Sequence, residues 1–399
     1  MVNRRAQKRI YLDNAATSFP KAPGLGKATS DFLERACMNL NRTNGKNGFG
    51  LFEKVYDLRR GIAKLYGLST PESVCFTGGL TESLNLLIKG LFSETSCGNF
   101  KSADCPACHV IVSSCEHNSV MRPLVQEGIA FSRIPSDREG YIKTDEIEKL
   151  IRPNTKAMII CAAGNVTGAV QDINTIARIA YKNKINLFID SAQATPFIKL
   201  DMKADHIAGI AFTAHKGLLG PEGIGGIALR KDIAQSIPPL ISGGTGSQSD
   251  SENIPTTLPD RLEAGTQNLP GLIGFYHSLA YIEENLNALR ETEMKMTQRL
   301  GKGIESINGL HLVGAPLDKP RTSVISVVSD KLDISEISAL LSERYNIETR
   351  VGMHCSPSSH KSIGTFPNGT LRFSPGPFTT EKEIDITIEA LKEIMGDKK

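Results

Sequence analysis

The sequence lacks a strong charge of either sign. Its 399 residues hold 46 Lys and Arg against 43 Asp and Glu, which gives a formal net charge of +3. Such a small imbalance favours no acidic partner, and no block of basic residues is long enough to indicate a nucleic-acid patch. A short basic start, interpreted as a solvated arm, holds Arg4, Arg5, Lys8 and Arg9. We therefore expect no nucleic-acid partner.

Long apolar runs are also missing. No run reaches the ~20 residues that a membrane-spanning helix needs. The N-terminus passes from basic residues straight into Tyr11-Leu-Asp-Asn-Ala-Ala, without the apolar core of a secretory signal. The sequence thus predicts a cytoplasmic protein that does not engage a membrane.

Cysteines are few and widely spaced. The 8 cysteines do not resemble the framework of a disulfide-rich secreted domain, and Cys75 and Cys161 lie in apolar runs typical of buried, reduced thiols. Cys105-Pro-Ala-Cys108-His109 forms a Cys-x-x-Cys pair which, together with Cys97, resembles part of a zinc or redox site. Because the ligand spacing is incomplete, we predict a surface loop without a metal.

Short apolar runs alternate with amphipathic helical patterns between residues 53 and 211. This alternation predicts a mainly parallel β-sheet covered by helices on both faces. The expected strands are 74–76, 110–112, 157–160, 185–189 and 207–212, and the expected helices are 53–66, 81–91, 173–182 and one near Asn118.

The character of the sequence changes after residue 238. Residues 238–270 are rich in Gly, Ser, Pro and Thr and should be mostly loop. A long helical pattern follows at 271–307, with Gly301 and Gly303 as a weak point. Strands at 322–328 and 370–374 then alternate with helices at 335–345 and 381–395, an α+β pattern. We predict an α/β fold with a large domain at 20–270 and a smaller one formed by 1–19 and 271–399.

Polar or Gly-rich segments follow the predicted strands of the large domain. Ligands of open parallel sheets bind at the carboxyl ends of the strands, so these segments should form one site. They are Thr77-Gly-Gly-Leu-Thr81, Ser114-Cys-Glu-His117, Ala163-Gly-Asn165, Asp190-Ser-Ala-Gln193 and Thr213-Ala-His-Lys216.

Together these segments supply what pyridoxal phosphate requires. The cofactor needs a lysine for its imine, an acid at the pyridine nitrogen, a phosphate cradle and a group against the ring. Lys216 is the candidate lysine; the alternative, an ordinary surface lysine, is disfavoured by the surrounding His-Lys-Gly and Gly-Pro-x-Gly pattern. Asp190 can keep the pyridine nitrogen protonated, or can simply cap a helix.

The remaining strand ends supply phosphate and ring contacts. The turn from Gly78 through Leu80 to Thr81 offers N–H groups and a hydroxyl to a phosphate, or is a capped turn with Thr81 as N-cap. His117 can stack on the ring and move protons, or be a helix cap or a satisfied core group. Asn165 and Gln193 can hydrogen-bond the ring oxygen, or bond locally within their turns.

Three further candidates lie near the C-terminus. Cys355 is surrounded by Gly, Ser and Pro, which predicts an exposed, mobile loop with a nucleophilic thiol, or else a spare surface thiol. Arg372 can clamp a substrate carboxylate through two hydrogen bonds, or form a structural ion pair. Arg350, at the start of the Cys355 segment, is also predicted to contact the substrate.

The order of these motifs resembles the cysteine desulfurase family, within the class V aminotransferase group of fold-type I pyridoxal-phosphate enzymes. The resemblance covers nearly the whole chain, from Tyr11 to Thr380. Its most specific parts are Cys115-Glu-His-Asn-Ser-Val120, Asn165-Val-Thr-Gly168, Asp190-Ser-Ala-Gln193, His215-Lys216 and Arg261-Leu-Glu-Ala-Gly-Thr266.

The resemblance implies a reaction and a role for each motif. L-Cysteine becomes L-alanine while a persulfide forms on Cys355, from which a sulfur-acceptor protein takes the sulfur. Lys216 forms the Schiff base, and Arg372 binds the substrate carboxylate. Thr245, in the segment 243–246, reaches the phosphate of the other subunit of a homodimer. Further phosphate ligands are Thr81, Thr213 and His215.

Other functions stay open at this point. A selenocysteine lyase or another cysteine-type β-lyase would use the same cofactor site, and so would a class V aminotransferase. A non-catalytic scaffold is disfavoured by the joint presence of Lys216, Asp190 and His117.

The sequence departs from the family pattern at the substrate rim. The family's Asn-Pro-Gly-Arg-Gly-x-His stretch reads Asn41-Arg-Thr-Asn-Gly-Lys-Asn47, which loses an arginine and a histidine. The Ser-Asn before Val-Thr-Gly reads Gly164-Asn165, and Gly-Thr-Pro-Asn reads Gly265-Thr-Gln-Asn268. The cofactor residues are therefore intact, whereas the substrate rim is altered.

Overall fold

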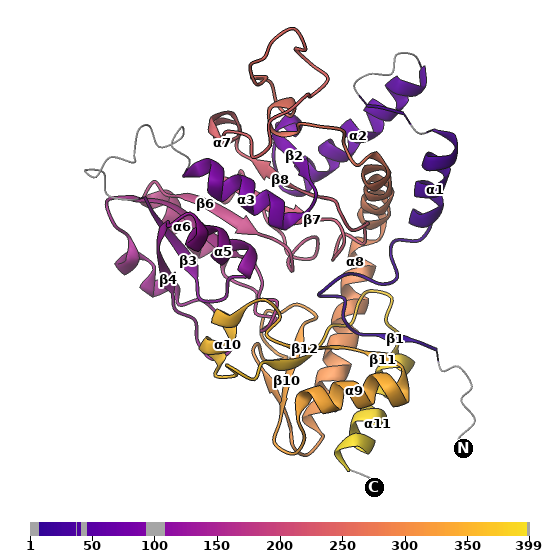
Figure 1. Ribbon diagram of the computed structural model, residues 1–399. Coiled ribbons are helices and arrows are strands. Elements are labelled where there is room, and N and C mark those ends of the chain that lie inside the picture. The colour runs from indigo at the N-terminus through magenta and orange to yellow at the C-terminus, as the bar shows by residue number, and fades with distance from the viewer. Residues whose placement is uncertain (1–7, 37, 41–45, 93–107, 397–399) are drawn as a thin grey trace.

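A computed structural model describes residues 8–36, 38–40, 46–92 and 108–396, without the side chains of 46–49. Its centre is a seven-stranded sheet in the order β2-β8-β7-β6-β5-β3-β4 (Figure 1). β8 runs antiparallel to both of its neighbours, while the other pairs are parallel. The predicted, mainly parallel sheet is confirmed. Its strands are β2 (Val74–Thr77), β3 (His109–Ser113), β4 (Ala130–Ile134), β5 (Thr155–Cys161), β6 (Asn186–Asp190), β7 (Gly209–Thr213) and β8 (Gly225–Leu229).

Successive residues of the central strands face opposite sides of this sheet. On β5, Met158 and Ile160 belong to one buried core, and Ala157 and Ile159 to another. This two-sided burial explains why the strands read as continuous apolar runs. One core is covered by α1 (Leu25–Arg35), α2 (Lys46–Leu65), α6 (Ile173–Lys182) and the start of α8 (Leu269–Glu305), and the other by α3 (Leu80–Leu91), α5 (Asn118–Gln126) and α7 (Lys231–Ser236).

A smaller unit follows along α8. Its antiparallel sheet has the order β12-β13-β10-β9, and β1 pairs in parallel with β11, so the N-terminal segment also belongs here (Figure 1). Its strands are β1 (Ile10–Tyr11), β9 (Leu310–Val313), β10 (Ile325–Ser329), β11 (Ile347–Glu348), β12 (Arg350–Gly352) and β13 (Thr370–Phe373), and its helices are α9 (Ile334–Tyr345), α10 (Pro357–Ile363) and α11 (Glu381–Met395).

Helix α8 belongs to both units. Leu272 and Phe275 pack into a core of the large sheet, whereas Met296, Leu300 and Ile304 pack into the core of the small one. The division at residue 270 therefore stays a prediction.

Glycines account for two differences from the predicted elements. Gly301 and Gly303 do not weaken α8; a Cβ on Gly301 would lie 2.5 Å from a methyl carbon of Leu317, so the missing side chain permits close packing. β8 escaped prediction because it begins Gly225-Gly226. A Cβ on Gly226 would lie 2.5 Å from the carbonyl oxygen of Cys75 on the adjacent strand, which explains why glycine is needed there.

Short 3-10 turns complete the described chain at Pro71–Ser73, Thr144–Glu146, Glu148–Leu150 and Asp260–Leu262. Among the described helices, none combines the length and the apolar character that crossing a membrane requires.

A buried ion pair joins the Arg261–Thr266 motif to helix α2 beside the large sheet. Arg59 of α2 donates to both carboxylate oxygens of Glu263 at 2.6 and 2.5 Å, and Glu263 also accepts from Phe76 N on β2 at 2.6 Å. The two side chains are only 6% and 5% exposed. Loss of one partner would leave the other charge buried without compensation.

We predict that Arg59→Met lowers the free energy of unfolding by about 3 to 5 kcal/mol. The matched control is Arg60→Met on the same helix, whose side chain is 60% exposed and pairs with Asp57 at the surface. Denaturant titration of both variants should show a large loss for the first and a much smaller one for the second. Equal losses would contradict a special role for the buried pair.

Candidate active site

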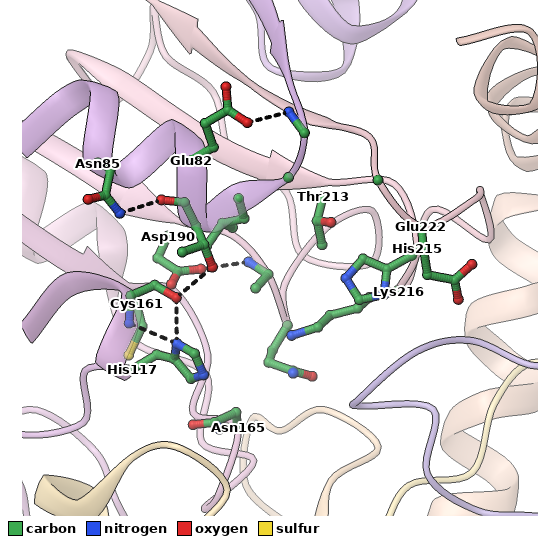
Figure 2. Close-up of a pocket in the computed structure, with 18 of the residues that line it drawn as sticks. Glu82, Asn85, His117, Cys161, Asn165, Asp190, Thr213, His215, Lys216 and Glu222 are labelled. Carbon is green, nitrogen blue, oxygen red and sulfur yellow. Dashed lines mark hydrogen bonds between the residues drawn. The ribbon is translucent and has the colours of Figure 1, made fainter. Parts of the chain in front are cut away.

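The five predicted strand ends meet in one pocket of about 580 Å³ (Figure 2). Parallel pairing brings β5, β6 and β7 to the same edge of the sheet. Cys161 and Asp190, the last residues of β5 and β6, are partners, and Ala211, the other partner of Asp190, precedes the end of β7 at Thr213. Predicted residues that line the pocket are Leu80, Thr81, His117, Asn165, Asp190, Gln193, Thr213, His215 and Lys216.

Lys216 lies in the turn that follows β7. Burial is the main cause that lowers the pKa of its amine to about 8; the Asp190 carboxylate opposes this effect, while Arg372 and Arg350 add to it. The turn depends on Gly217, where a Cβ would lie 2.4 Å from the carbonyl oxygen of Thr195. The lysine is therefore held inside the pocket, with its amine more readily neutral than that of a surface lysine.

Asp190 is the last residue of β6 and is 4% exposed. Its Oδ1 accepts a hydrogen bond from Ala192 N at 2.9 Å. No helix follows directly, so the helix-cap alternative for Asp190 is wrong. Burial raises the pKa of its carboxyl, and the Ala192 N–H and Lys216 oppose the rise. The carboxylate lies across the pocket from Lys216 (Figure 2).

The predicted phosphate cradle lies at the start of α3. The helix begins at Leu80 with Gly79 as its N-cap, so the alternative with Thr81 as N-cap is wrong. Gly79 has a φ of 152°, which L side chains rarely adopt. The first N–H groups of a helix have no partner within it, so those of Leu80 and Thr81 can face an anion. Thr81 Oγ1 lies 3.0 Å from Ser119 Oγ.

His117 is both a pocket residue and a helix cap. Its Nδ1 accepts from Ser119 N at 3.0 Å, which makes it the N-cap of α5. Because Nδ1 is the acceptor, the ring proton lies on Nε2. Burial, followed by the positive charge of Lys216, lowers the pKa of His117 to about 4, so the ring is neutral near pH 7.

His215 and Thr213 stand next to Lys216. His215 Nδ1 is buried and has no hydrogen-bond partner within the described part of the chain. Burial, with Lys216 and Lys21, lowers the pKa of His215 to about 4. Thr213 Oγ1 makes only a long contact, 3.5 Å, to the Ile224 carbonyl. Both side chains thus retain capacity for a ligand.

Two predicted ring contacts bond to residues distant in sequence. Gln193 Nε2 donates to the Ala15 carbonyl at 2.9 Å, and Asn165 Nδ2 donates to the His354 carbonyl at 2.6 Å. Neither bond is the local turn contact considered from the sequence. Thr245 does not line the pocket of its own chain, and its Oγ1 lies 3.1 Å from Ser247 Oγ.

Cys355 is exposed, as predicted. It lies in a hydrogen-bonded turn that leads into α10 two residues later. Asn118 N, at the start of α5, donates to the Cys355 carbonyl at 2.9 Å. This bond holds the backbone of Cys355 against the residue that follows His117.

Two arginines occupy directly opposite positions on β12 and β13. Arg372 is 2% exposed; it donates from Nη2 to Asp13 Oδ1 at 2.7 Å and from Nη1 to the Asn165 carbonyl at 3.0 Å. The Nε atom of Arg372 is buried and lacks a partner among the described residues. Arg350 forms no ion pair with any described residue. Like charges in opposite register repel each other, and one carboxylate does not balance two guanidinium groups. The pair is suited to a second anion.

Sequence reasoning missed two acids near the pocket. Asp13, which pairs with Arg372, lies in the quoted Tyr11-Leu-Asp motif. Glu116 lies between Cys115 and His117 and is fully buried; its Oε1 accepts from Ser113 Oγ at 2.6 Å and from Cys161 N at 3.0 Å. Burial raises the pKa of Glu116 to about 8, so a neutral acid lies behind the pocket. The motifs that carry the family resemblance were the available signal for both residues.

The predicted Cys-x-x-Cys insertion falls largely outside the described residues, which exclude Cys97 and Cys105. His109 lies on β3, with its two ring nitrogens 2.8 Å from Thr155 Oγ1 and 2.9 Å from Ser132 Oγ. The described ranges contain no cluster of three or more His, Cys, Asp or Glu side chains suited to a metal.

Known proteins of similar sequence and structure cover nearly the whole chain. A "Probable cysteine desulfurase" of Methanothermobacter thermautotrophicus is 28% identical over 97% of this chain and 95% of that protein. "Cysteine desulfurase IscS" of Methanosarcina thermophila is 27% identical, over 97% and 92%. The apo structure of a cysteine desulfurase from Thermococcus onnurineus superposes with a TM-score of 0.86 at 26% identity, over 98% and 95%.

The family model described as aminotransferase class-V matches residues 10–387. That span includes all five strand ends, the Cys355 turn and both arginines. The pocket also fits the cofactor of this family, because an amine, a buried carboxylate, open helix N–H groups and an unpartnered imidazole converge there. The chain therefore belongs to the class-V aminotransferase family of pyridoxal-phosphate-dependent enzymes.

Proposed function

We propose that this enzyme is a cysteine desulfurase that converts L-cysteine to L-alanine and forms a persulfide on Cys355. The observation that carries the proposal is the position of the exposed thiol. Its turn is hydrogen-bonded to Asn118 and to the pocket residue Asn165. The Asn165 carbonyl accepts from Arg372, whose Nε has no partner among the described residues. A nucleophile and a carboxylate-binding group thus meet beside the cofactor pocket. The names of the relatives agree with this reaction.

Each pocket residue has a role toward bound pyridoxal phosphate. Lys216 would hold its aldehyde carbon, Asp190 its ring nitrogen, and the N–H groups of Leu80 and Thr81 its phosphate, together with Thr213 and His215. Bound there, the cofactor supplies an electron sink for cleavage at the substrate's α-carbon. Asp190 is suited to this role because it is buried and keeps a carboxylate oxygen for the pocket.

The arginines orient the substrate. Arg372 Nε and the guanidinium of Arg350 bind the α-carboxylate, which fixes the amino group toward Lys216 and the thiol toward Cys355. Lys216, with a pKa near 8, is able to accept the α-proton once its amine is free. His117, neutral and held at Nδ1 by Ser119, presents Nε2–H as a proton carrier above the pocket.

Sulfur transfer is then a nucleophilic displacement at the substrate sulfur. A bond forms between Cys355 Sγ and the substrate sulfur while the carbon–sulfur bond breaks. The electron pair of the broken bond remains with the substrate carbon, which takes up a proton to give the methyl group of alanine. The persulfide remains on an exposed residue, where a sulfur-acceptor protein can reach it.

A second copy of the chain completes the proposed enzyme. Leu240, which lines the pocket, is 39% exposed, and Ile241 and Ile254 in the same segment between α7 and α8 are 57% and 42% exposed. Covering such side chains stabilises a homodimer and would bring Thr245 of one chain to the phosphate of the other. The reactive thiol needs a reducing compartment, which agrees with the predicted cytoplasm.

The Cys355→Ser variant tests the nucleophile. We expect it to keep the visible absorption of the cofactor but to lose cysteine turnover by about 100-fold or more, because a hydroxyl is a poor nucleophile toward sulfur. The measurement is alanine formed from cysteine and from selenocysteine. Cys108→Ser, directly before β3 and outside the pocket lining, is the control thiol and should keep full turnover.

Unchanged cysteine turnover in Cys355→Ser would contradict the nucleophile. Retained turnover of selenocysteine alone would favour a lyase, and dependence on a keto acid would favour transamination. A wild-type protein that stays colourless with added cofactor would favour a scaffold.

Arg350→Ala tests the proposed excess of positive charge at the rim. We expect KM for cysteine to rise about 10-fold, because a charge-assisted contact to the carboxylate is lost. The protein should still bind the cofactor fully, since Arg350 does not line the pocket. Steady-state kinetics and absorption spectra check both expectations. An unchanged KM would remove Arg350 from the substrate site.

Labelling of Lys216 tests the pocket electrostatics. In cofactor-free protein, pyridoxal phosphate and borohydride should modify Lys216 with a rate that rises with pH through about 8, because the neutral amine reacts and burial lowers its pKa. Asp190→Asn should move that midpoint lower, since the carboxylate raises the pKa of Lys216. Peptide mapping locates the label. A midpoint near that of a free lysine, or a label elsewhere, would contradict the assignment.

A further inference from the structure

The Cys355 turn has an unusual backbone. His354 and Cys355 have φ values of 46° and 60°, so two consecutive residues other than glycine adopt the left-handed conformation. L-residues with a Cβ disfavour this region and remain there when surrounding contacts impose it. The thiol is therefore presented by a turn that needs external support.

Hydrogen bonds from three directions supply that support. Below the turn, His354 is 4% exposed, with Nε2 3.1 Å from both the carbonyl and the hydroxyl oxygen of Thr370 on β13. From α5, Asn118 N donates to the Cys355 carbonyl. From the end of β5, the side chain of Asn165 contacts the residues on either side of Cys355.

Asn165 uses both atoms of its amide on this turn. Its Nδ2 donates to the His354 carbonyl at 2.6 Å, and its Oδ1 accepts from Ser356 Oγ at 2.7 Å. A backbone carbonyl can only accept, so the amide nitrogen must face His354 and the amide oxygen must face Ser356. The Ser356 hydroxyl therefore acts as donor, and the orientation of the Asn165 amide is determined by its partners.

One hydrogen-bond donor of Asn165 remains. An amide nitrogen carries two protons, and one of them is used on His354. Asn165 lines the same pocket as His117 and Lys216, and Figure 2 shows it below His117. What remains is an N–H donor, which suits the anionic oxygen on the ring of pyridoxal phosphate. If the Asn165 amide were inverted, its own oxygen, an acceptor, would instead face the ring oxygen of the cofactor.

We propose that Ser356 is a positioning residue that couples the nucleophile turn to the cofactor. Its hydroxyl holds the turn that presents Cys355, and the same hydrogen bond keeps an N–H of Asn165 directed toward the cofactor ring oxygen. The inference rests on the proposed function in taking Cys355 as the nucleophile. Ser356 is 0% exposed and does not itself line the pocket, so it acts through Asn165, which does.

The Ser356→Ala variant of the full-length holoenzyme tests this coupling with two measurements. The first is the rate at which iodoacetamide alkylates Cys355, followed by peptide mass spectrometry. We expect the rate to rise about 3-fold or more, because the turn loses one of its supports. The second is the pH midpoint of the visible absorption of the bound cofactor. We expect it to move upward, because an N–H donor stabilises the anionic ring oxygen and disfavours a proton beside it.

The chain provides a closely matched control. Ser359 lies three residues further along, on α10, and is 1% exposed, and its hydroxyl has no hydrogen-bond partner among the residues that the structure describes. Ser359→Ala also removes a buried hydroxyl but should leave both measurements unchanged. Ser356→Thr restores a hydroxyl and should return both values toward wild type, which separates the hydrogen bond from a general loss of packing. Asn165→Ala should change both measurements at least as much as Ser356→Ala.

A Ser356→Ala variant that matches Ser359→Ala in both measurements would overturn the proposal. Faster alkylation with an unmoved absorption midpoint would also overturn it, because the turn would then be independent of the cofactor. Neither measurement requires turnover, so a wild-type protein that releases no alanine from cysteine counts against the proposed function alone.

Discussion

The parallel hydrogen-bonded register of β5, β6 and β7 is the constraint on which the site depends. It places Asp190 opposite Cys161 on one side and Ala211 on the other, so the strands end at the same edge of the sheet. The turns that follow must then deliver Asn165 and Lys216 into a common space. Since backbone pairing on a fully buried sheet sets these positions, they tolerate little adjustment by individual side chains.

Electrostatics divides the pocket into a neutral part and a cationic part. Near the cofactor position, burial lowers the pKa of Lys216, His117 and His215, so amine and imidazoles lose their protons readily. Arg372 and Arg350 form a cationic part on opposite positions of two strands, where the single carboxylate of Asp13 pairs with Arg372. The first arrangement suits covalent chemistry at an amine, and the second selects an anionic substrate.

Periodicity and strand-end chemistry predicted the sheet, most helices and the pocket residues correctly, because buried strands and amphipathic helices leave strong local patterns. Contacts between residues far apart in sequence left no such pattern. The Asp13 contact to Arg372, the Asn165 bonds to the Cys355 turn and the burial of Glu116 each depend on the tertiary arrangement. The cap on His117 shows that a structural role and a site role can coincide in one side chain.

The 37-residue helix α8 has a mechanical consequence. Since its first half is embedded in the core of the large sheet and its second half in that of the small one, any rotation between them must bend a continuous helix. Rotation of the small unit as a whole is therefore a costly way to move Cys355 relative to Lys216, and any large displacement of the thiol has to come from its own turn.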